Sequence, residues 1–193
     1  MENFEKWELE RMVLAPYIQK STALRGKTRY VGGNQFRHAL GTMAILIDYH
    51  YIDPILLKAA IIHDLFEDVN HVRPDEIIQL DKDGPEVYKL VVEVTRNENE
   101  TKSQFLERIL TTGTEKAKVL KCADRISNLT DLHTDTFNRD FIKRYLEETK
   151  EWIIPMAEQV NANMLFELND IIKRREAHLT FLSQIWSTKK VKH

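Results

Sequence analysis

Apolar side chains recur at steps of three and four residues along almost the whole chain, as in Phe36, Leu40, Met43 and Ile47. This spacing puts them on one face of a helix, and no stretch shows the strict alternation of a half-buried strand. The 193 residues include only 6 Gly and 5 Pro, too few for many short strands joined by tight turns. We therefore predict an all-α fold, a compact helical bundle of one domain.

The predicted helices follow this periodicity and are separated by turn residues. Asp53 and Pro54 provide an N-cap and a first helical residue. A glycine-containing loop is expected over 21–35, and a frayed basic tail over 187–193. No linker divides the chain, so 1–193 is expected to be a single domain. The helices are expected at about 3–20, 36–50, 54–67, 74–80, 85–95, 103–111, 114–132, 139–158 and 161–186.

Composition excludes several classes of protein. The net charge of -2 argues against a nucleic-acid binder. No apolar run approaches the roughly 20 residues of a membrane span, and the acidic start has no apolar core of a secretory signal. The single Cys122 rules out a disulfide framework and fits a reducing compartment. We expect a cytoplasmic protein without nucleic-acid or membrane partners, and the sequence leaves its oligomeric state open.

One short segment concentrates the groups that bind metals. His63, Asp64, Glu67 and Asp68 lie three or four residues apart in pairs, so one helical turn would collect an imidazole and three carboxylates. Carboxylates packed this closely repel one another and lose hydration, and a cation would make the arrangement tolerable. The alternative is a solvated acidic end of a helix.

Two distant residues have the chemistry to complete a metal site. His38 follows the glycine-containing loop, and Asp124 lies on a later predicted helix. Two imidazoles and two carboxylates suit Mn, Fe, Co, Ni or Zn better than Ca or Mg. A single His on a helix is more often a core or surface residue, and His133, near Asp131, is the best alternative ligand.

The same region could also hold a substrate. Asp124, Asn128 and Asp131 follow steps of four and three, so they share a helical stripe, and Lys121 precedes it by one turn. An amide and a second carboxylate beside a metal ligand can bind a sugar or a base. Cations that could bind phosphates, unless they are ordinary surface charges, are Arg25, Lys27, Arg29, Arg37, Lys121 and Arg125.

The ordered set of His38, His63-Asp64 and Asp124 resembles the H…HD…D pattern of the HD phosphohydrolase superfamily. Further segments look like the hydrolase domain of RelA/SpoT-type alarmone enzymes, over about residues 20–170. The length leaves no room for a synthetase domain, so the chain is similar to the small stand-alone alarmone hydrolases. The segments that carry this are Arg29-Tyr30-Val31-Gly32, Glu67-Asp68, 91–95 and 123–129.

The resemblance implies an HD-type bundle and a metal-dependent hydrolase whose substrate is a small nucleotide. The reaction would remove the 3′-pyrophosphate from ppGpp or pppGpp. Glu67 and Asp68 would orient or deprotonate the attacking water, with either one as the base. Arg29 would stack on guanine and Asn128 would contact the nucleoside. One divalent ion, Mn²⁺ first and Fe, Co, Ni or Zn otherwise, would be held by His38, His63, Asp64 and Asp124.

Three positions depart from the family pattern, all near the expected nucleotide pocket. Ala39 replaces a proline, Gln35-Phe36 stands where a tyrosine is usual, and Asp131 replaces a threonine. These departures leave the metal ligands intact but open the choice of substrate. The alternatives are an HD phosphohydrolase acting on a nucleoside monophosphate or NADPH, and a nucleotide sensor without catalysis.

Overall fold

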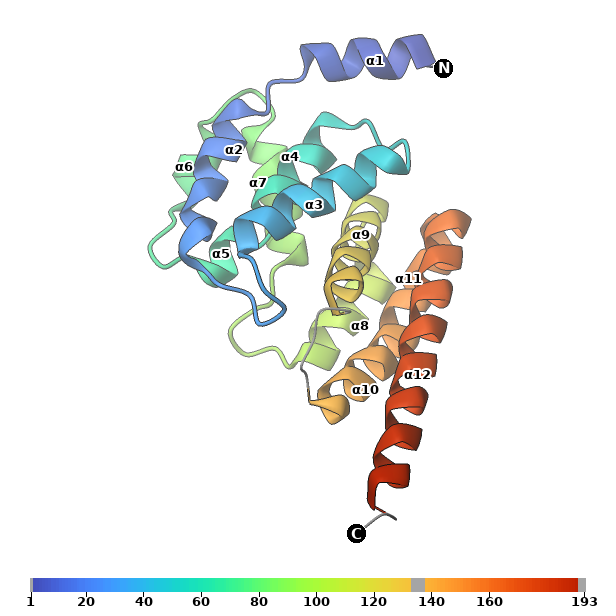
Figure 1. Cartoon of the computed structure of the whole chain (residues 1–193). Helices are drawn as coiled ribbons and strands as arrows, with labels where there is room; N and C mark the ends of the chain where they lie inside the picture. Colours follow the sequence, from blue (N-terminus) through green and yellow to red (C-terminus); the bar gives the residue numbers. More distant parts are fainter. Residues whose placement is uncertain (1, 133–137, 191–193) are drawn as a thin grey trace.

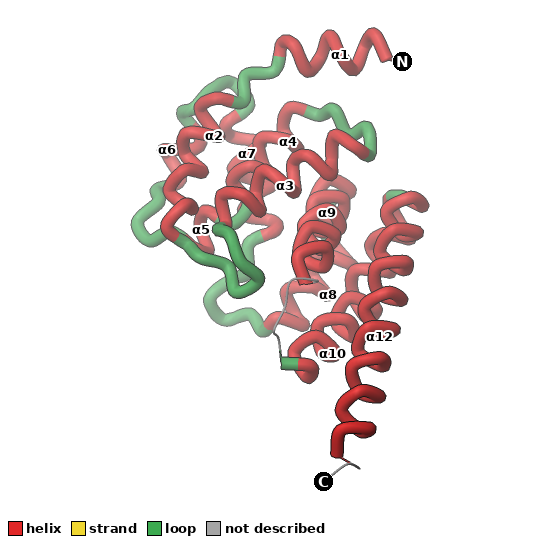
Figure 2. Tube along the Cα trace, viewed as in Figure 1, coloured by secondary structure: helices red, strands yellow, loops and turns green. Residues whose placement is uncertain are grey.

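The computed structural model describes residues 2–132 and 138–190, and within these ranges it is helical without a strand. The predicted all-α class is therefore confirmed (Figures 1 and 2). One isolated antiparallel bridge joins Thr28 to Asn34. The α-helices are α1 (Glu2–Arg11), α2 (Ala15–Ser21), α3 (Gln35–Asp48), α4 (Pro54–Ile62), α5 (Leu65–Asp68), α6 (Pro74–Ile78), α7 (Gly84–Val94), α8 (Lys102–Thr112), α9 (Glu115–Asp131), α10 (Arg139–Glu148), α11 (Ile154–Val160) and α12 (Ala162–Lys190).

The core lies where α3, α4, α7 and α9 pack together. Helix α9 also contacts α11 and α12, so it stands between an N-terminal group of helices and a C-terminal one (Figure 1). Every residue of α4 from Leu56 to Ile62 is buried, as its Leu-, Ala- and Ile-rich sequence predicts. Asp53 caps this helix, because its side chain accepts a hydrogen bond from the backbone N–H of Leu56. The buried α4 thus fixes the position of whatever follows Ile62.

Two predicted helices are interrupted. The helix expected over 3–20 is split into α1 and α2, because Pro16 opens α2 and has no N–H to continue a preceding helix. The helix expected to run to Glu67 ends at Ile62. His63 and Asp64 form a turn there, and a separate single turn, α5, carries Glu67. The stop places His63 and Asp64 at a helix end rather than on a continuous helical face.

The loop before α3 is shorter than expected and tightly folded. Residues Thr22–Gly26 form a 3₁₀ turn. Gly32 and Gly33 then take φ values of +92° and +74°, a left-handed conformation that glycine adopts without strain. Asn34 ends the loop and caps α3 by accepting from the backbone N–H of Arg37 at 2.9 Å. The loop is thereby held against the first turn of α3.

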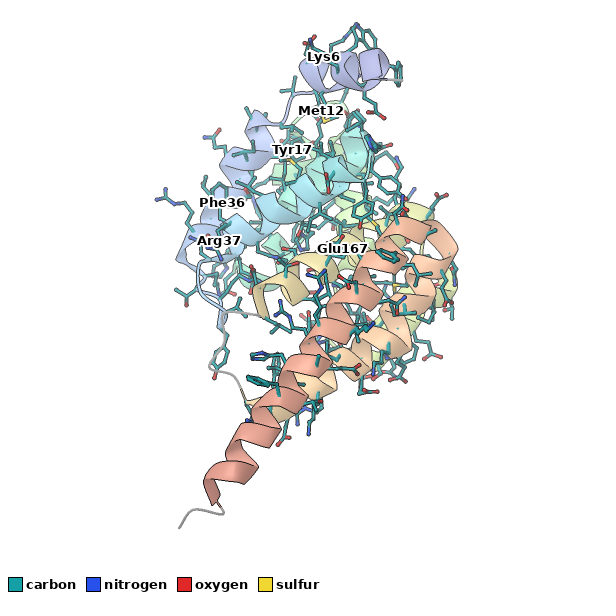
Figure 3. All side chains as sticks on the ribbon, turned by 45° about the vertical axis from the view of Figure 1, so that its right-hand side comes forward. Lys6, Met12, Tyr17, Phe36, Arg37 and Glu167 are labelled. Atoms are coloured by element: carbon teal, nitrogen blue, oxygen red, sulfur yellow. The ribbon has the colours of Figure 1, made fainter. Side chains whose placement is uncertain are left out.

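The C-terminal helices form one nearly continuous run. The helix expected over 139–158 contains a π-helical turn at Thr149–Ile153 between α10 and α11. Helix α12 extends to Lys190, so 187–190 is helical rather than frayed, and 191–193 lies outside the described residues. Tyr49, directly after α3, donates a hydrogen bond to Glu167 of α12. Figure 3 shows where Glu167 lies on this long helix. In the part of the chain that is described, no helix combines the length and apolar character needed to cross a membrane.

A buried charge cluster joins α2 and α4 to the turn before α7. The Lys58 side chain is 3 % exposed, and its Nζ lies 2.5 Å from Asp81 Oδ2 and 2.7 Å from Asp83 Oδ2. The Tyr17 hydroxyl donates to Asp81 Oδ1 at 2.8 Å. Burial opposes ionisation of Asp81, but the hydrogen bonds from Lys58 and Tyr17 outweigh it and lower its pKa. The ionised cluster therefore stabilises the folded state.

Replacing Lys58 with methionine keeps an unbranched side chain one atom shorter but leaves two carboxylates without their cation. We expect K58M to lose about 3 kcal/mol of unfolding free energy at pH 7, as for other broken buried ion pairs. In the wild type, the contribution of Asp81 is complete above the unfolded carboxyl pKa of about 4 and is lost as pH falls through the lower folded-state pKa. K58M should lack this acid dependence.

Urea unfolding between pH 3 and pH 7 measures both effects. The exposed neighbour Lys82 provides the control variant K82M, which should stay within about 0.5 kcal/mol of the wild type. Equal unfolding midpoints for K58M and K82M would show that the cluster does not stabilise the fold.

Candidate functional site

Four side chains from three separate segments converge beneath the loop that precedes α3. His38 projects from the first turns of α3, His63 and Asp64 from the turn after α4, and Asp124 from the middle of α9. His38 Nε2 lies 3.1 Å from Asp124 Oδ1 and 3.6 Å from Asp64 Oδ2. His63 Nε2 lies 3.2 Å from Asp64 Oδ1 and 3.8 Å from Asp124 Oδ1. Residues that are far apart in the sequence thus share one centre.

This cluster has the donor set of a cation site. One potential ligand atom each from His38, His63 and Asp124 lie within 4.8 Å of one another, and all three residues are buried. The outer nitrogens are fixed, because His38 Nδ1 is 2.9 Å from Ser127 Oγ and His63 Nδ1 is 2.8 Å from the Ala60 carbonyl oxygen. Both Nε2 atoms therefore face the centre, the usual arrangement of metal-binding histidines.

One atom in the cluster lacks a partner. His63 Nε2 is buried and has no hydrogen bond among the described residues. Burial lowers the pKa of His63, but the charges of Asp64 and Asp124 outweigh it and raise the pKa to about 9. The carboxylates therefore favour a positive charge at the centre, and a divalent cation there would also give Nε2 a partner. The residues present fit a metal ion.

Asp124 is held in its ionised form. Burial opposes ionisation, but the charge of Lys121 and the imidazoles of His38 and His63 outweigh it, and its pKa lies well below the usual range. Lys121 Nζ lies 2.8 Å from Oδ2, and Asn128 Nδ2 donates to Oδ1 at 2.6 Å. Lys121 and Asn128 lie one turn before and one turn after Asp124 on α9, so they position a carboxylate ready to bind a cation.

The two acidic residues of α5 point in different directions. Asp68 Oδ2 accepts a hydrogen bond from Gln35 Nε2 at 2.8 Å, beside the cluster. Glu67 Oε1 accepts from the backbone N–H of Arg96 at 2.9 Å, toward the connection between α7 and α8. Both carboxylates lie on one helical turn, as their spacing predicts, but their contacts differ. Asp68 is bonded to Gln35, and Glu67 is bonded to the loop after α7.

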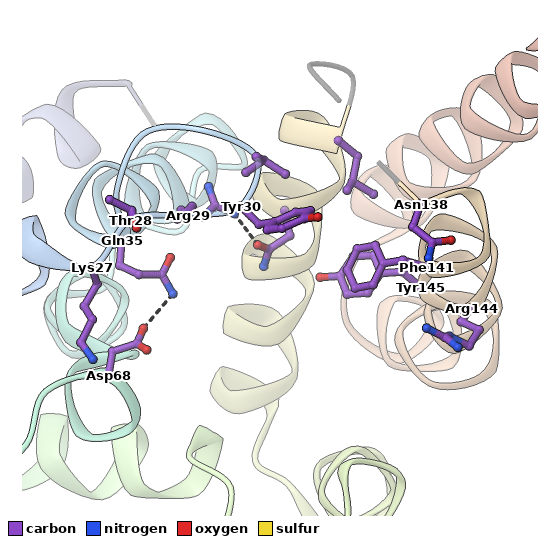
Figure 4. A pocket seen from close by; sticks show the side chains of 13 residues that line it. Lys27, Thr28, Arg29, Tyr30, Gln35, Asp68, Asn138, Phe141, Arg144 and Tyr145 are labelled. Carbon is purple, nitrogen blue, oxygen red and sulfur yellow. Dashed lines mark hydrogen bonds between the residues drawn. The ribbon is translucent and has the colours of Figure 1, made fainter. Parts of the chain in front are cut away.

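Two adjoining cavities open beside the cluster. The inner one, about 180 Å³, is lined by His38, Asp64 and Asp124 together with Lys102, Lys121 and Arg125. The outer one, about 660 Å³, is large enough for a nucleotide. Gln35, Asn128 and Tyr145 line both. Figure 4 shows the outer cavity. The outer cavity is lined by Lys27, Thr28, Arg29, Tyr30, Val31, Gln35, Asp68, Asn128, Leu132, Asn138, Phe141, Arg144 and Tyr145.

Arg29 is engaged by the protein. Its side chain is 8 % exposed, its NH2 group donates to Asn128 Oδ1 at 2.6 Å, and its NH1 group is ion-paired with Asp131. A chain of contacts therefore runs from Asp131 through Arg29 and Asn128 to Asp124. The aspartate that departs from the family pattern is the partner of the arginine expected to stack on a base.

The remaining predicted residues divide between the cavities and the surface. Lys27 lines the outer cavity and Lys121 the inner one, whereas Arg25 lines neither. His133 lies outside the described residues. Sequence reasoning missed the aromatic and basic wall supplied by α10. Nothing in the local pattern of Phe141, Arg144 and Tyr145 shows that they share a cavity with the loop before α3 (Figure 4). Ser127 could have been found, since it lies three residues after Asp124 on the same helix.

The chain is similar in sequence to known proteins whose names include a guanosine-3′,5′-bis(diphosphate) 3′-pyrophosphohydrolase. No protein-family model matches the chain. It is 28 % identical over 146 residues to guanosine-3′,5′-bis(diphosphate) 3′-pyrophosphohydrolase MESH1 of Drosophila melanogaster, covering 72 % of this chain and 79 % of that protein. It is 25 % identical over 165 residues to the probable GTP diphosphokinase RSH3, chloroplastic, of rice, covering 78 % of this chain. The chain spans only 22 % of the rice protein.

A solved structure shares the fold. It is described as a metazoan ortholog of SpoT that hydrolyzes ppGpp, and it matches with a TM-score of 0.72 and 25 % identity over 83 % of this chain and 93 % of that chain. An all-α body in which a histidine, a His-Asp turn and a later aspartate meet defines an HD-domain protein. Within that class, the chain is similar to RelA/SpoT-type proteins, as its sequence resemblance indicates.

Removing the amide of Asn128 should weaken the metal centre without unfolding the protein. The variant N128A loses the hydrogen bond to Asp124 and the link to Arg29. Loss of such a supporting contact typically lowers metal affinity 10- to 100-fold, and we expect about tenfold for Mn²⁺ by titration calorimetry.

Asn169 provides a matched control. Its Nδ2 donates to the carbonyl four residues earlier, as that of Asn128 does, but it is exposed on α12 and touches no carboxylate in any contact described for it. N169A should bind Mn²⁺ as the wild type does. Equal affinities in both variants would rule out a supporting role for Asn128.

Proposed function

We propose that this chain is a metal-dependent hydrolase that removes the 3′-pyrophosphate from guanosine-3′,5′-bis(diphosphate) or its pentaphosphate, with residues 1–193 as one HD-type hydrolase domain. The observation that carries the proposal is the convergence of His38, His63, Asp64 and Asp124 on one buried centre that adjoins a cavity of about 660 Å³. The likeness to a pyrophosphohydrolase over most of both chains supports the choice of substrate.

The metal would be held by His38, His63, Asp64 and Asp124. Two imidazoles with two carboxylates suit Mn²⁺ first, and Fe, Co, Ni or Zn next, better than Ca or Mg. A bound divalent ion supplies a Lewis acid and lowers the pKa of water. The raised pKa of His63 adds a condition, because a proton on its imidazole must leave before a metal can bind.

The protein's own residues would move the proton and offset the charge of the substrate. Asp68, beside the cluster, is placed to accept a proton from the attacking water, and Glu67, tied to the backbone of Arg96, would orient that region. Water adds at the phosphorus attached to the ribose 3′-oxygen, the bond between them breaks, and that oxygen takes a proton. Lys102, Lys121 and Arg125 line the inner cavity. Each already has a carboxylate partner, Glu148 or Asp124, so they would offset only part of the charge of the diphosphate.

Substitutions should separate metal binding from chemistry. H63A and D64A are expected to lose both bound Mn²⁺ and activity, because each removes a ligand. D68A should keep the metal and lose about 10²- to 10⁴-fold in kcat, the usual contribution of a general base. E67A should also keep the metal, with a smaller loss in kcat. Elemental analysis and release of pyrophosphate measure the two properties. Full turnover by a metal-free H63A protein would overturn the proposal.

A second candidate substrate class follows from the state of Arg29. Because Asp131 already neutralises this arginine, the pocket has one less available cation for a highly charged nucleotide. Another nucleotide, such as a nucleoside monophosphate or NADPH, would need fewer cations.

A panel of ppGpp, pppGpp, nucleoside monophosphates and NADPH, each with Mn²⁺, decides between these substrates. We expect the two alarmones to give the highest kcat/KM, by at least tenfold, with GDP or GTP and pyrophosphate as products. Thermal stabilisation by ppGpp without any product would indicate a sensor instead of an enzyme.

A further inference from the structure

Gln35 occupies a junction that the proposed reaction does not yet explain. It is the first residue of α3, three residues before His38, and it lines both the inner and the outer cavity. It also lies where the resembling family usually has a tyrosine. In Figure 4 its side chain extends toward Asp68 at the edge of the outer cavity. Gln35 therefore lies where the two cavities meet.

The nitrogen of the amide holds two carboxylates together. Gln35 Nε2 donates to Asp68 Oδ2 at 2.8 Å and to Asp64 Oδ2 at 3.3 Å. Two ionised carboxylates repel each other, so a shared neutral donor stabilises them in place without adding a charge. The contacts also fix the amide, because its nitrogen must face the two acceptors and its oxygen must therefore face away.

The oxygen of the same amide has nothing to accept from. Gln35 Oε1 is buried and has no hydrogen-bond partner among the described residues. A buried acceptor without a donor is unfavourable, and such groups in native proteins call for an explanation. Rotating the amide would give Oε1 no donor and would also break the hydrogen bonds from Nε2 to the two carboxylates. A donor supplied by a ligand would satisfy Oε1 without that loss.

The proposed substrate has a hydrogen-bond donor, the ribose 2′-hydroxyl, close to its reacting ester. In a nucleoside 3′-diphosphate, the 2′-hydroxyl is on the carbon next to the one that bears the reacting ester. If that ester lies at the cluster of Asp64 and Asp124, the 2′-hydroxyl lies within a few bonds of it. Gln35 contacts Asp64 directly. The acceptor and this hydroxyl therefore belong to the same small region.

We propose that Gln35 is a positioning and specificity-determining residue, whose Nε2 fixes Asp64 and Asp68 and whose Oε1 accepts a hydrogen bond from the ribose 2′-hydroxyl of the substrate. This inference rests on the proposed function and deepens it. It makes the enzyme selective for ribonucleotides over 2′-deoxyribonucleotides.

The test compares ppGpp with its 2′-deoxy analogue in kcat/KM. The wild type should prefer the ribonucleotide about tenfold, a ratio within the range for one hydrogen bond. Q35M, which keeps the side-chain length and loses both polar groups, should lower that preference to within about twofold. The exposed Gln79 supplies the control Q79M, which should keep the tenfold preference.

A second variant distinguishes the role of the amide donor from that of the amide acceptor. Q35E keeps an acceptor but loses the donor and adds a carboxylate beside Asp64 and Asp68. It should lower kcat at least tenfold with both substrates while keeping the ribose preference. If the wild type hydrolyses both substrates equally, or if Q35M keeps the full preference, the inference is wrong. If the wild type hydrolyses neither compound, the proposed function itself has failed.

Discussion

The carboxylate of Asp124 lies inside the helical body, where an unpaired charge would be strongly unfavourable. Its compensation comes from two sources. Lys121 and Asn128 are supplied by α9 itself, one turn to either side. His38 comes from α3 and His63 from the turn after α4, so their contribution depends on how those helices pack against α9. The packing of the core and the electrostatics of the candidate metal centre therefore constrain each other, because moving any one of the three helices would leave the buried carboxylate undercompensated.

The cations near the proposed nucleotide pocket are already paired with carboxylates of the protein. In the inner cavity, Lys121 pairs with Asp124, and both Lys102 and Arg125 pair with Glu148. At the outer cavity, Arg29 is paired with Asp131. An arginine in such a pair presents its guanidinium to the protein and contributes less to attracting phosphates. Through Asn128 it bears on Asp124 instead. Asp131, which stands where the family pattern has a threonine, thus binds Arg29 and holds it against the protein.

The sequence predicted the parts of this site that depend on spacing and residue type. The all-α class followed from the periodicity, and the cap at Asp53 followed from the Asp-Pro pair. His38, His63 and Asp124 are brought together as their order in the chain indicated. What could not be predicted depends on tertiary contact. Nothing local shows that Arg29 pairs with Asp131, 102 residues later, or that α10 forms a wall of the cavity. The π-helical turn before α11 does have a local signal, because Pro155 has no N–H to donate to the carbonyl of Glu151.

The predicted helix over 54–67 is broken after Ile62, and this break has a chemical reason. Neighbouring residues on a continuous helix point about 100° apart, so adjacent side chains do not face a common point. Ending α4 at Ile62 puts His63 and Asp64 in a turn, with Asp64 near φ -90° and ψ 0°, a sparsely occupied region often used at functional sites. There His63 Nε2 and Asp64 Oδ1 come within 3.2 Å. The periodic pattern continues through this point because Leu65 is still buried, and so the pattern alone predicts a helix. The chemistry of the centre requires it to stop.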